Sequence, residues 1–287
     1  MKQAIEMKNV VKAYDRGFRL GELNITIPSG VIVGLIGENG AGKTTMIKSL
    51  LNVIRIDQGT IRIFEQDHQQ QESKIKEDIG VVLDQTFFPE LLTPKEINSI
   101  MKEIYSSWDQ ELFFQYLKDF SLPVDKQIRK MSKGMRKKLE IATALAHHPK
   151  LLILDEPTSG LDPVVRNEVL DLFLDFIQEE DHTILFSTHI TSDLEHIADQ
   201  IIFIDQGKIL LNQSRDELLD NYGILKCPLE QMDTIDTQDY IAYKKNRYDA
   251  EFLVTNRRAV QKKYTDSIVD PASLEDIMVF MIKGVKK

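Results

Sequence analysis

The chain has 287 residues, 42% of them hydrophobic, and a formal net charge of −9 at pH 7. This length allows a sizeable core, and the acidic balance argues against a nucleic-acid partner, since binding a phosphate backbone requires a basic surface. The single cysteine, Cys227, excludes an internal disulfide and a cysteine zinc site, which favours a reducing compartment. Because no apolar signal region and no run of about 18 apolar residues is present, we expect any membrane crossing to be made by another chain.

Two segments near the N-terminus, residues 5–11 and 20–27, alternate apolar and polar side chains. This alternation predicts two antiparallel strands joined through Asp15-Arg16-Gly17. Tyr14 lies between them, where an aromatic ring could stack on an adenine. Packing is the more common role of a tyrosine in such a place, so both interpretations stay open.

A near-continuous apolar run over residues 31–36 leads into Gly37-Glu38-Asn39-Gly40-Ala41-Gly42-Lys43-Thr44. This stretch matches the pattern G-x-x-x-x-G-K-[ST], and apolar residues at helical spacing follow it. The order of strand, glycine loop and helix predicts a site for a triphosphate. The glycines allow several backbone N–H groups to approach the phosphate oxygens at once.

Three side chains at the end of this loop have predicted roles. Lys43 is expected to reach the β- and γ-phosphates, and the hydroxyl of Thr44 to bind Mg²⁺. Thr45 is expected to donate on the α-phosphate side.

The next segments predict a strand over residues 59–63, a polar helix over 69–77 and a buried strand over 79–83. Asp84 and Gln85 follow that strand, at the edge where open α/β sheets bind ligands. Gln85 could bind Mg²⁺ or orient the attacking water, although a surface amide ending a strand is the more frequent case.

Residues 87–149 change to a helical pattern. Thr93-Pro94-Lys95-Glu96 is a capping box with proline at the first helical position, so it predicts a helix start. Further helices are expected over about 110–120 and 133–146. This segment therefore reads as a helical insertion in the sheet.

A strand is predicted again at residues 151–154, where four aliphatic residues precede Asp155 and Glu156. We expect Asp155 to hold Mg²⁺ through its water shell and Glu156 to polarise a water molecule against the γ-phosphate. A further strand over 183–188 ends at His189, for which a hydrogen bond to the γ-phosphate is the favoured role over a structural one.

The motifs, taken in order, resemble those of the ATP-binding subunit of an ATP-binding-cassette (ABC) transporter, over residues 1 to about 215. They are the phosphate loop, Gln85, Ser132-Lys133-Gly134-Met135, the acidic pair, Ser159-Gly160-Leu161-Asp162 and His189. The resemblance implies ATP and Mg²⁺ as cofactors and an α/β fold. That fold has a RecA-like P-loop NTPase core with an antiparallel β-subdomain (residues 1–86 and 150–214) and an α-helical subdomain (87–149).

The resemblance also implies two cassettes, identical or different, that face head to tail with two ATP molecules between them. Ser132 and Gly134 would contact the ATP of the opposing subunit, and Asp162 belongs to the implied nucleotide site. One motif departs from the family pattern: the usual Leu-Ser-Gly-Gly-Gln is here Met131-Ser132-Lys133-Gly134-Met135. Met135 loses the polar contact of the usual glutamine, which puts the strength of ATP-driven dimerisation in question.

Residues 215–287 lie outside the cassette and are expected to form a small α+β accessory region. A short helix over 214–219, strands over 240–243 and 251–254, and a final helix opening near Ala272 are predicted. Packing against the cassette is the more frequent role for such a tail. The tail also resembles that of bacterial ABC-2-type exporters, including those that expel peptides.

The favoured function is the ATPase subunit of a membrane exporter, bound to the cytoplasmic face of the membrane only through a separate transmembrane permease subunit. The substrate would be a peptide or an amphipathic small molecule. The segment from Gln85 to Leu92 is expected to form the groove for a short helix of that permease. The alternative is a soluble ABC-type ATPase of translation or DNA repair, although the fused cassettes, zinc modules or long coiled coils of those groups are not evident. A non-catalytic regulatory cassette is disfavoured because Lys43, Asp155, Glu156 and His189 are all present.

Overall fold

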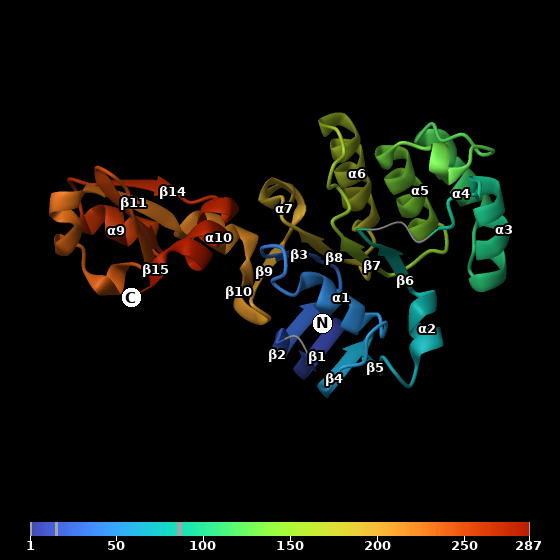
Figure 1. Ribbon diagram of the computed structural model, residues 1–287, viewed down its shortest axis with the longest axis horizontal. Helices are drawn as coiled ribbons and strands as arrows, with labels where there is room; N and C mark the ends of the chain where they lie inside the picture. Colours follow the sequence, from blue (N-terminus) through green and yellow to red (C-terminus); the bar gives the residue numbers. More distant parts are fainter. Residues whose placement is uncertain (1, 15–16, 85–87, 287) are drawn as a thin grey trace.

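The computed structural model describes residues 2–14, 17–84 and 88–286, which form three β-sheets with helices around them (Figure 1). The C-terminal residues lie at one end of the long axis, and the helices α3 to α5 lie at the other. Among the described residues, no helix is both long and apolar enough to cross a membrane.

The central sheet has six strands in the order β10-β9-β3-β8-β7-β6, parallel except for β10. They are β3 (Ile32–Ile36), β6 (Ile79–Val82), β7 (Leu151–Asp155), β8 (Thr183–Thr188), β9 (Gln200–Asp205) and β10 (Lys208–Ser214). In β3, Ile32 and Ile36 pack into one hydrophobic cluster while Val33 and Leu35 pack into another on the opposite face. Burial on both faces explains the continuous apolar runs in the sequence.

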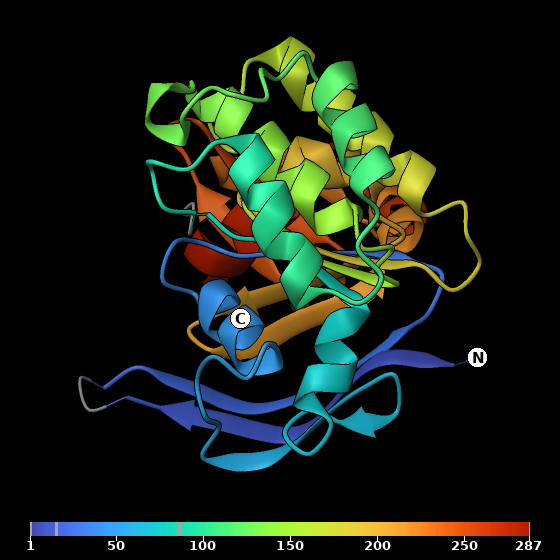
Figure 2. The ribbon, with the colours of Figure 1, turned by 90° about the vertical axis from the view of Figure 1, so that its right-hand side faces the viewer.

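A four-stranded antiparallel layer, in the order β2-β1-β4-β5, lies below the central sheet in Figure 2. Its strands are β1 (Gln3–Ala13), β2 (Arg19–Pro28), β4 (Gln58–Ile63) and β5 (Gln66–Asp67). Helix α1 (Lys43–Leu50) packs between this layer and the central sheet, because Met46 and Ile47 share a hydrophobic cluster with residues of both. The short α2 (Glu72–Glu77) leads into β6.

Between β6 and β7 the chain forms α3 (Pro94–Ile104), α4 (Gln110–Asp119), the 3₁₀ turn η1 (Ile128–Lys130) and α5 (Lys133–Leu145). This segment has its own apolar cluster, which includes Ile97, Phe113 and Leu139. The capping box that the sequence predicted at Thr93 is formed, with Thr93 Oγ1 accepting from the Glu96 N–H and the Glu96 carboxylate accepting from the Thr93 N–H. Helices α6 (Pro163–Phe176) and α7 (Thr191–Ile197) contribute to the other large cluster.

The C-terminal region is a five-stranded antiparallel sheet in the order β14-β11-β13-β12-β15. Its elements are α8 (Arg215–Asn221), β11 (Gly223–Pro228), η2 (Leu229–Thr234), η3 (Thr237–Asp239), β12 (Ala242–Lys245), β13 (Asp249–Val254), α9 (Arg257–Lys263), β14 (Ile268–Pro271), α10 (Leu274–Lys283) and β15 (Val285–Lys286). The strand expected over residues 240–243 is displaced towards the C-terminus, because Tyr240 turns into the local core, with its ring centroid 4.9 Å from that of Phe252.

Candidate nucleotide site

The site lies at one edge of the central sheet, where β3, β6, β7 and β8 end. Because these strands are parallel neighbours, the loop after β3, Asp84 after β6, the pair Asp155-Glu156 and His189 meet at the same edge. Gln85, which the sequence predicted as a ligand at this edge, lies outside the described residues, and so does Phe87.

Two glycines of the phosphate loop occupy places that no other residue could take without rearrangement. A Cβ on Gly37 would lie 2.3 Å from the carbonyl oxygen of Ile204 in β9. Gly42, the N-cap of α1, has φ +116°, a left-handed conformation that favours glycine. The loop therefore begins close against the sheet and ends in a turn that starts the helix, with the first N–H groups of α1 directed at the site.

Lys43 is almost fully buried, with 6% of its surface exposed. Its Nζ donates to the carbonyl oxygen of Gly37 at 2.7 Å and lies 3.9 Å from Oε1 of Glu156. Burial lowers the pKa of Lys43, while the carboxylates of Glu156 and Asp155 act in the opposite direction. The ammonium of Lys43 is thus held at the sheet edge by neutral carbonyl oxygens. A phosphate oxygen, which is charged, would bind the ammonium more strongly and could replace them.

Thr44 and Asp155 form an oxygen pair that suits Mg²⁺. The Thr44 hydroxyl donates to Oδ2 of Asp155 at 2.9 Å. Hydroxyl and carboxylate oxygens are donors that Mg²⁺ prefers, and because Mg²⁺ usually keeps several of its waters, Asp155 would hold the ion through its water shell. The other oxygen of Asp155 accepts from Ser187, which pairs with Asp155 across β7 and β8, so the carboxylate is held in one orientation. Ser187 was not predicted from the sequence, because its pairing with Asp155 depends on the register of two strands that lie far apart in the chain.

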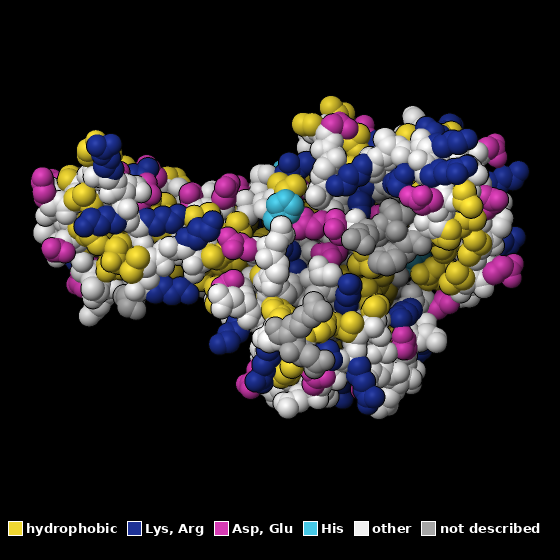
Figure 3. All heavy atoms as spheres, in the orientation of Figure 1, with side chains coloured by type: hydrophobic (Ala, Val, Ile, Leu, Met, Phe, Trp, Pro, Cys, Tyr) yellow, Lys and Arg dark blue, Asp and Glu magenta, His cyan; other side chains and the backbone are white. Residues whose placement is uncertain are grey.

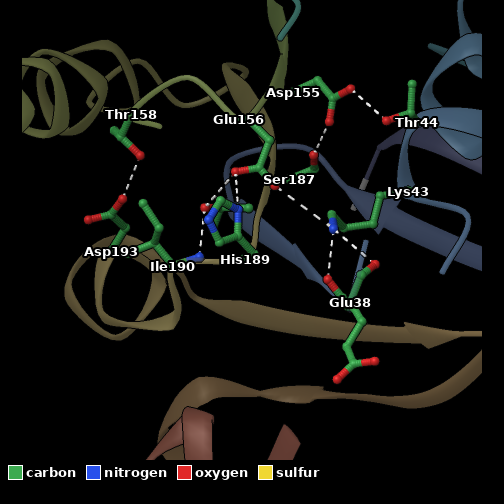
Figure 4. A network of polar contacts seen from close by, with 12 residues as sticks. Glu38, Lys43, Thr44, Asp155, Glu156, Thr158, Ser187, His189, Ile190 and Asp193 are labelled. Atoms are coloured by element: carbon green, nitrogen blue, oxygen red, sulfur yellow. Dashed lines mark hydrogen bonds and ion pairs between the residues drawn. The ribbon is translucent and has the colours of Figure 1, made fainter. Parts of the chain in front are cut away.

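Glu156 has a left-handed backbone conformation, with φ +52°, directly after the last strand residue. A non-glycine residue in this region is strained, and such strain is often found at functional sites. Its carboxylate receives hydrogen bonds from the hydroxyl of Thr188, at 3.3 Å, and contacts Nδ1 of His189 at 2.8 Å (Figure 4). His189 remains half exposed, so Glu156 lies between a buried lysine and a histidine that reaches solvent.

A pocket of about 440 Å³ opens at this edge. Seven of the nine predicted loop positions line it, together with Asp84, Asp155 and Glu156; these seven are Glu38, Asn39, Gly40, Gly42, Lys43, Thr44 and Thr45. The other two loop positions do not line the pocket: Gly37 packs against β9, and Ala41 is buried.

Phe18 is an aromatic residue that lines the pocket, and its ring also lies against Gly42. Tyr14, the residue that the sequence suggested for adenine, is 41% exposed, with its ring centroid 6.3 Å from that of Phe18. Phe18 was not predicted from the sequence, because a phenylalanine just before a strand carries no signal of its own.

Ser132 and Gly134 lie at the start of α5 and are not among the residues that line this pocket. Ser132 caps α5 by accepting from the N–H of Met135 at 3.2 Å, and Gly134 lies close to Leu161. Asp162 caps α6 by accepting from the N–H groups of Val164 and Val165. These three residues therefore lie together outside the pocket of their own chain.

A buried polar network supports the loop between β7 and α6. Thr158 donates to Oδ2 of Asp193 at 2.6 Å, and Arg166 donates to the other oxygen of the same carboxylate. This network ties the loop after Glu156 to α6 and α7. It joins residues far apart in sequence, so no local pattern reveals it.

The fold and this site define a P-loop nucleotide-binding protein. The family model described as ABC transporter matches residues 20–159. The chain is 34% identical over 218 residues to the ABC transporter ATP-binding protein YtrB of Bacillus subtilis (strain 168), covering 76% of this chain and 74% of YtrB. It is 36% identical over 212 residues to the bacitracin transport ATP-binding protein BcrA of Bacillus licheniformis, covering 73% of this chain and 69% of BcrA.

A solved structure described as the ATP binding subunit of an ABC transporter is similar with a TM-score of 0.68 at 25% identity, covering 75% of this chain and 91% of that one. The chain belongs to the ABC transporter family, as an ATP-binding subunit and ATPase. The expected α/β fold with a RecA-like P-loop NTPase core is confirmed.

Proposed function

We propose that this subunit hydrolyses ATP to power export through a separate transmembrane permease subunit, at the cytoplasmic face of the membrane. The proposed substrate is a peptide or an amphipathic small molecule, supported by the similarity to BcrA, whose name gives bacitracin transport. A soluble ATPase of translation or DNA repair is the alternative that the tests below distinguish.

The observation that carries the proposal is the convergence of Lys43, Asp155, Glu156 and His189 at one sheet edge. In the proposed mechanism, Lys43 leaves the Gly37 carbonyl to contact the β- and γ-phosphates. Glu156 accepts a hydrogen bond from the attacking water, and His189, already paired with Glu156, orients that carboxylate and contacts the γ-phosphate. Gln85 is proposed as a further Mg²⁺ and water ligand at the same edge.

Thr44 and Asp155 would hold Mg²⁺, which would neutralise charge on the β- and γ-phosphates. The loop residues from Gly37 to Thr45 would hold the phosphates, with Phe18 and Tyr14 as candidates for the base. Of these two aromatic residues, Phe18 is the better supported because it lines the pocket.

We propose that a second cassette completes each site, with Ser132 and Gly134 facing the ATP of the opposing subunit and Asp162 as a further residue of the nucleotide site. Ser132 and Gly134 lie at the start of α5 and are not among the described residues that line the pocket of their own chain, which supports this arrangement. We also propose that the chain is divided into three parts. Residues 1–86 and 150–214 form the ATP-binding core, residues 87–149 the helical subdomain and residues 215–287 the accessory region.

The test of the proposed function compares the parent with Glu156→Gln. The variant is expected to bind ATP as the parent does but to lose steady-state hydrolysis, because the carboxylate acts on water and not on the nucleotide. An ATP-bound dimer is expected to accumulate, which gel filtration with ATP would detect.

Glu230→Gln, a change in the C-terminal region, serves as the matched control and is expected to leave hydrolysis unchanged. Hydrolysis by Glu156→Gln within a factor of two of the parent would refute the assigned role. Co-purification with ribosomes or DNA, in place of a polytopic membrane protein, would support the alternative function.

A further inference from the structure

The last helix of the chain reaches the phosphate loop from the C-terminal region. Nζ of Lys283, the final residue of α10, lies 3.6 Å from Oε1 of Glu38. Glu38 also lines the pocket, and its carboxylate points away from Lys43 in Figure 4. A charged contact thus joins the C-terminal region to the loop that would hold the phosphates of ATP.

Other contacts fix α10 in this place independently of Lys283. Leu274, Ile277 and Phe280 are buried in the same cluster as residues of α7 and the central sheet. At the start of the helix, Oε1 of Glu195 in α7 accepts from the N–H of Leu274 at 2.7 Å. Because a carboxylate stabilises a helix N-terminus, Glu195 favours the start of α10. Lys283 can therefore be substituted without removing the helix.

Glu38 would oppose ATP binding if it stood alone. It places a negative charge in a loop that receives a triphosphate, and like charges repel. Lys283 compensates that charge, while Lys43 contacts only the backbone oxygen of Glu38, at 3.4 Å. Since the side chains of Lys283 and Glu38 are 66% and 47% exposed, solvent weakens the contact, and its effect must be moderate and sensitive to salt.

We propose that Lys283 is a positioning residue of the nucleotide site: it holds and neutralises Glu38, so that the C-terminal region raises the affinity of the phosphate loop for ATP. This inference rests on the proposed nucleotide site. It assigns the accessory region a part in ATP binding in addition to packing.

The experiment is a double-mutant cycle on the full chain, with Mg²⁺-ATP affinity measured at about 50 mM salt. Lys283→Gln is expected to raise the Kd for ATP about two- to fivefold, the range of an exposed ion pair. The turnover at saturating ATP should stay within a factor of two, and Lys283→Arg should restore the parent affinity. In a Glu38→Gln background, Lys283→Gln is expected to leave the Kd for ATP unchanged. At about 0.5 M salt, the parent and Lys283→Gln should have the same Kd.

Lys286→Gln, in β15, is the control for a general change of charge and is expected to leave the Kd unchanged. The inference is overturned if Lys283→Gln leaves the Kd unchanged, or if it raises the Kd equally with and without Glu38. Lys43→Ala separates this outcome from a failure of the proposed function: if the parent binds ATP and Lys43→Ala does not, the nucleotide site stands even when the cycle shows no coupling.

Discussion

Lys43 is the residue at which burial and charge act most directly on the nucleotide. Its ammonium is buried beside Asp155 and Glu156, which are positioned to retain a cation at the sheet edge. A triphosphate bound here would take this ammonium as its direct counter-charge.

We therefore predict that Lys43→Ala weakens ATP binding more than tenfold. Losing a charge-assisted hydrogen bond costs roughly 1.5–3 kcal/mol. Calorimetric titration with Mg²⁺-ATP measures the effect, and Lys48→Ala, later in the same helix α1, is the control that should keep the parent affinity. An unchanged affinity of Lys43→Ala would contradict the role of this residue.

His147 is a second residue whose burial has a measurable consequence. It is 1% exposed, its ring stacks on Tyr105 at 4.0 Å, and its Nε2 contacts the carbonyl oxygen of Ile79 at 3.1 Å. Burial lowers the pKa of His147 below the ordinary value of about 6.5. Between the lowered pKa and 6.5 the unfolded chain binds a proton that the folded chain does not, so stability falls as the pH falls through this range.

We predict that His147→Gln reduces this acid sensitivity. A single group contributes at most about 1.4 kcal/mol per pH unit, so the free energy of unfolding should change less between pH 7 and 5 in the variant. Urea denaturation at several pH values measures it. Identical pH profiles for the parent and His147→Gln would show that His147 does not cause the effect.

At the scale of elements, α6 and α7 are tied to the loop after Glu156 by the carboxylate of Asp193. That side chain is 2% exposed and is satisfied by Thr158 and Arg166. Removal of the arginine leaves a buried carboxylate with one partner fewer, which is costly because the group cannot regain water.

We predict that Arg166→Met lowers the free energy of unfolding by about 1.5–3 kcal/mol, the value of a hydrogen bond to a charged group. Chemical denaturation gives the change. Lys76→Met is the control, because the exposed pair of Lys76 and Glu72 in α2 should contribute less than about 1 kcal/mol. Equal destabilisation by the two substitutions would mean that the network around Asp193 is not specially stabilising.

The elements that the sequence predicted are those with a local signal. Adjacent residues were enough to predict the glycine loop, the capping box at Thr93 and the apolar strands β3, β7 and β8. The contacts that the sequence did not predict depend on the tertiary fold. Ser187 meets Asp155 across two strands, and Arg166 meets Asp193 between two helices. Phe18 lines the pocket from the connection just before β2.

At the scale of the whole molecule, helices α3 to α5 and the C-terminal region lie at opposite ends of the nucleotide-binding core (Figure 1). At the end with α3, a groove of about 200 Å³ runs between β6, α3 and α5, and Phe88 is one of the residues that line it, along with Leu83, Met101 and Tyr105. Hydrophobic side chains gather over α3 in Figure 3, where Ile100 and Ile104 are 41% and 56% exposed. Leu91, which the sequence predicted in the groove for the permease helix, is not among the described residues that line this groove and is 61% exposed. An exposed apolar surface beside the segment that follows β6 fits the expected helix of the permease.

We predict that the double substitution Leu91→Asp with Ile104→Asp reduces co-purification with the permease at least tenfold. Both side chains are exposed, so the isolated subunit should fold and bind ATP as the parent does. Two desolvated carboxylates would oppose burial of the exposed apolar surface beside the groove against an apolar helix. Tyr248→Asp, at a site that is 75% exposed in the C-terminal region, is the control for an added surface charge and should keep the complex intact. The measurement is co-purification from membranes, together with ATP affinity of each isolated variant. If the double variant formed the complex and supported transport as the parent does, the permease would have to bind elsewhere. If only Tyr248→Asp lost the complex, the docking surface for the permease would lie on the C-terminal region.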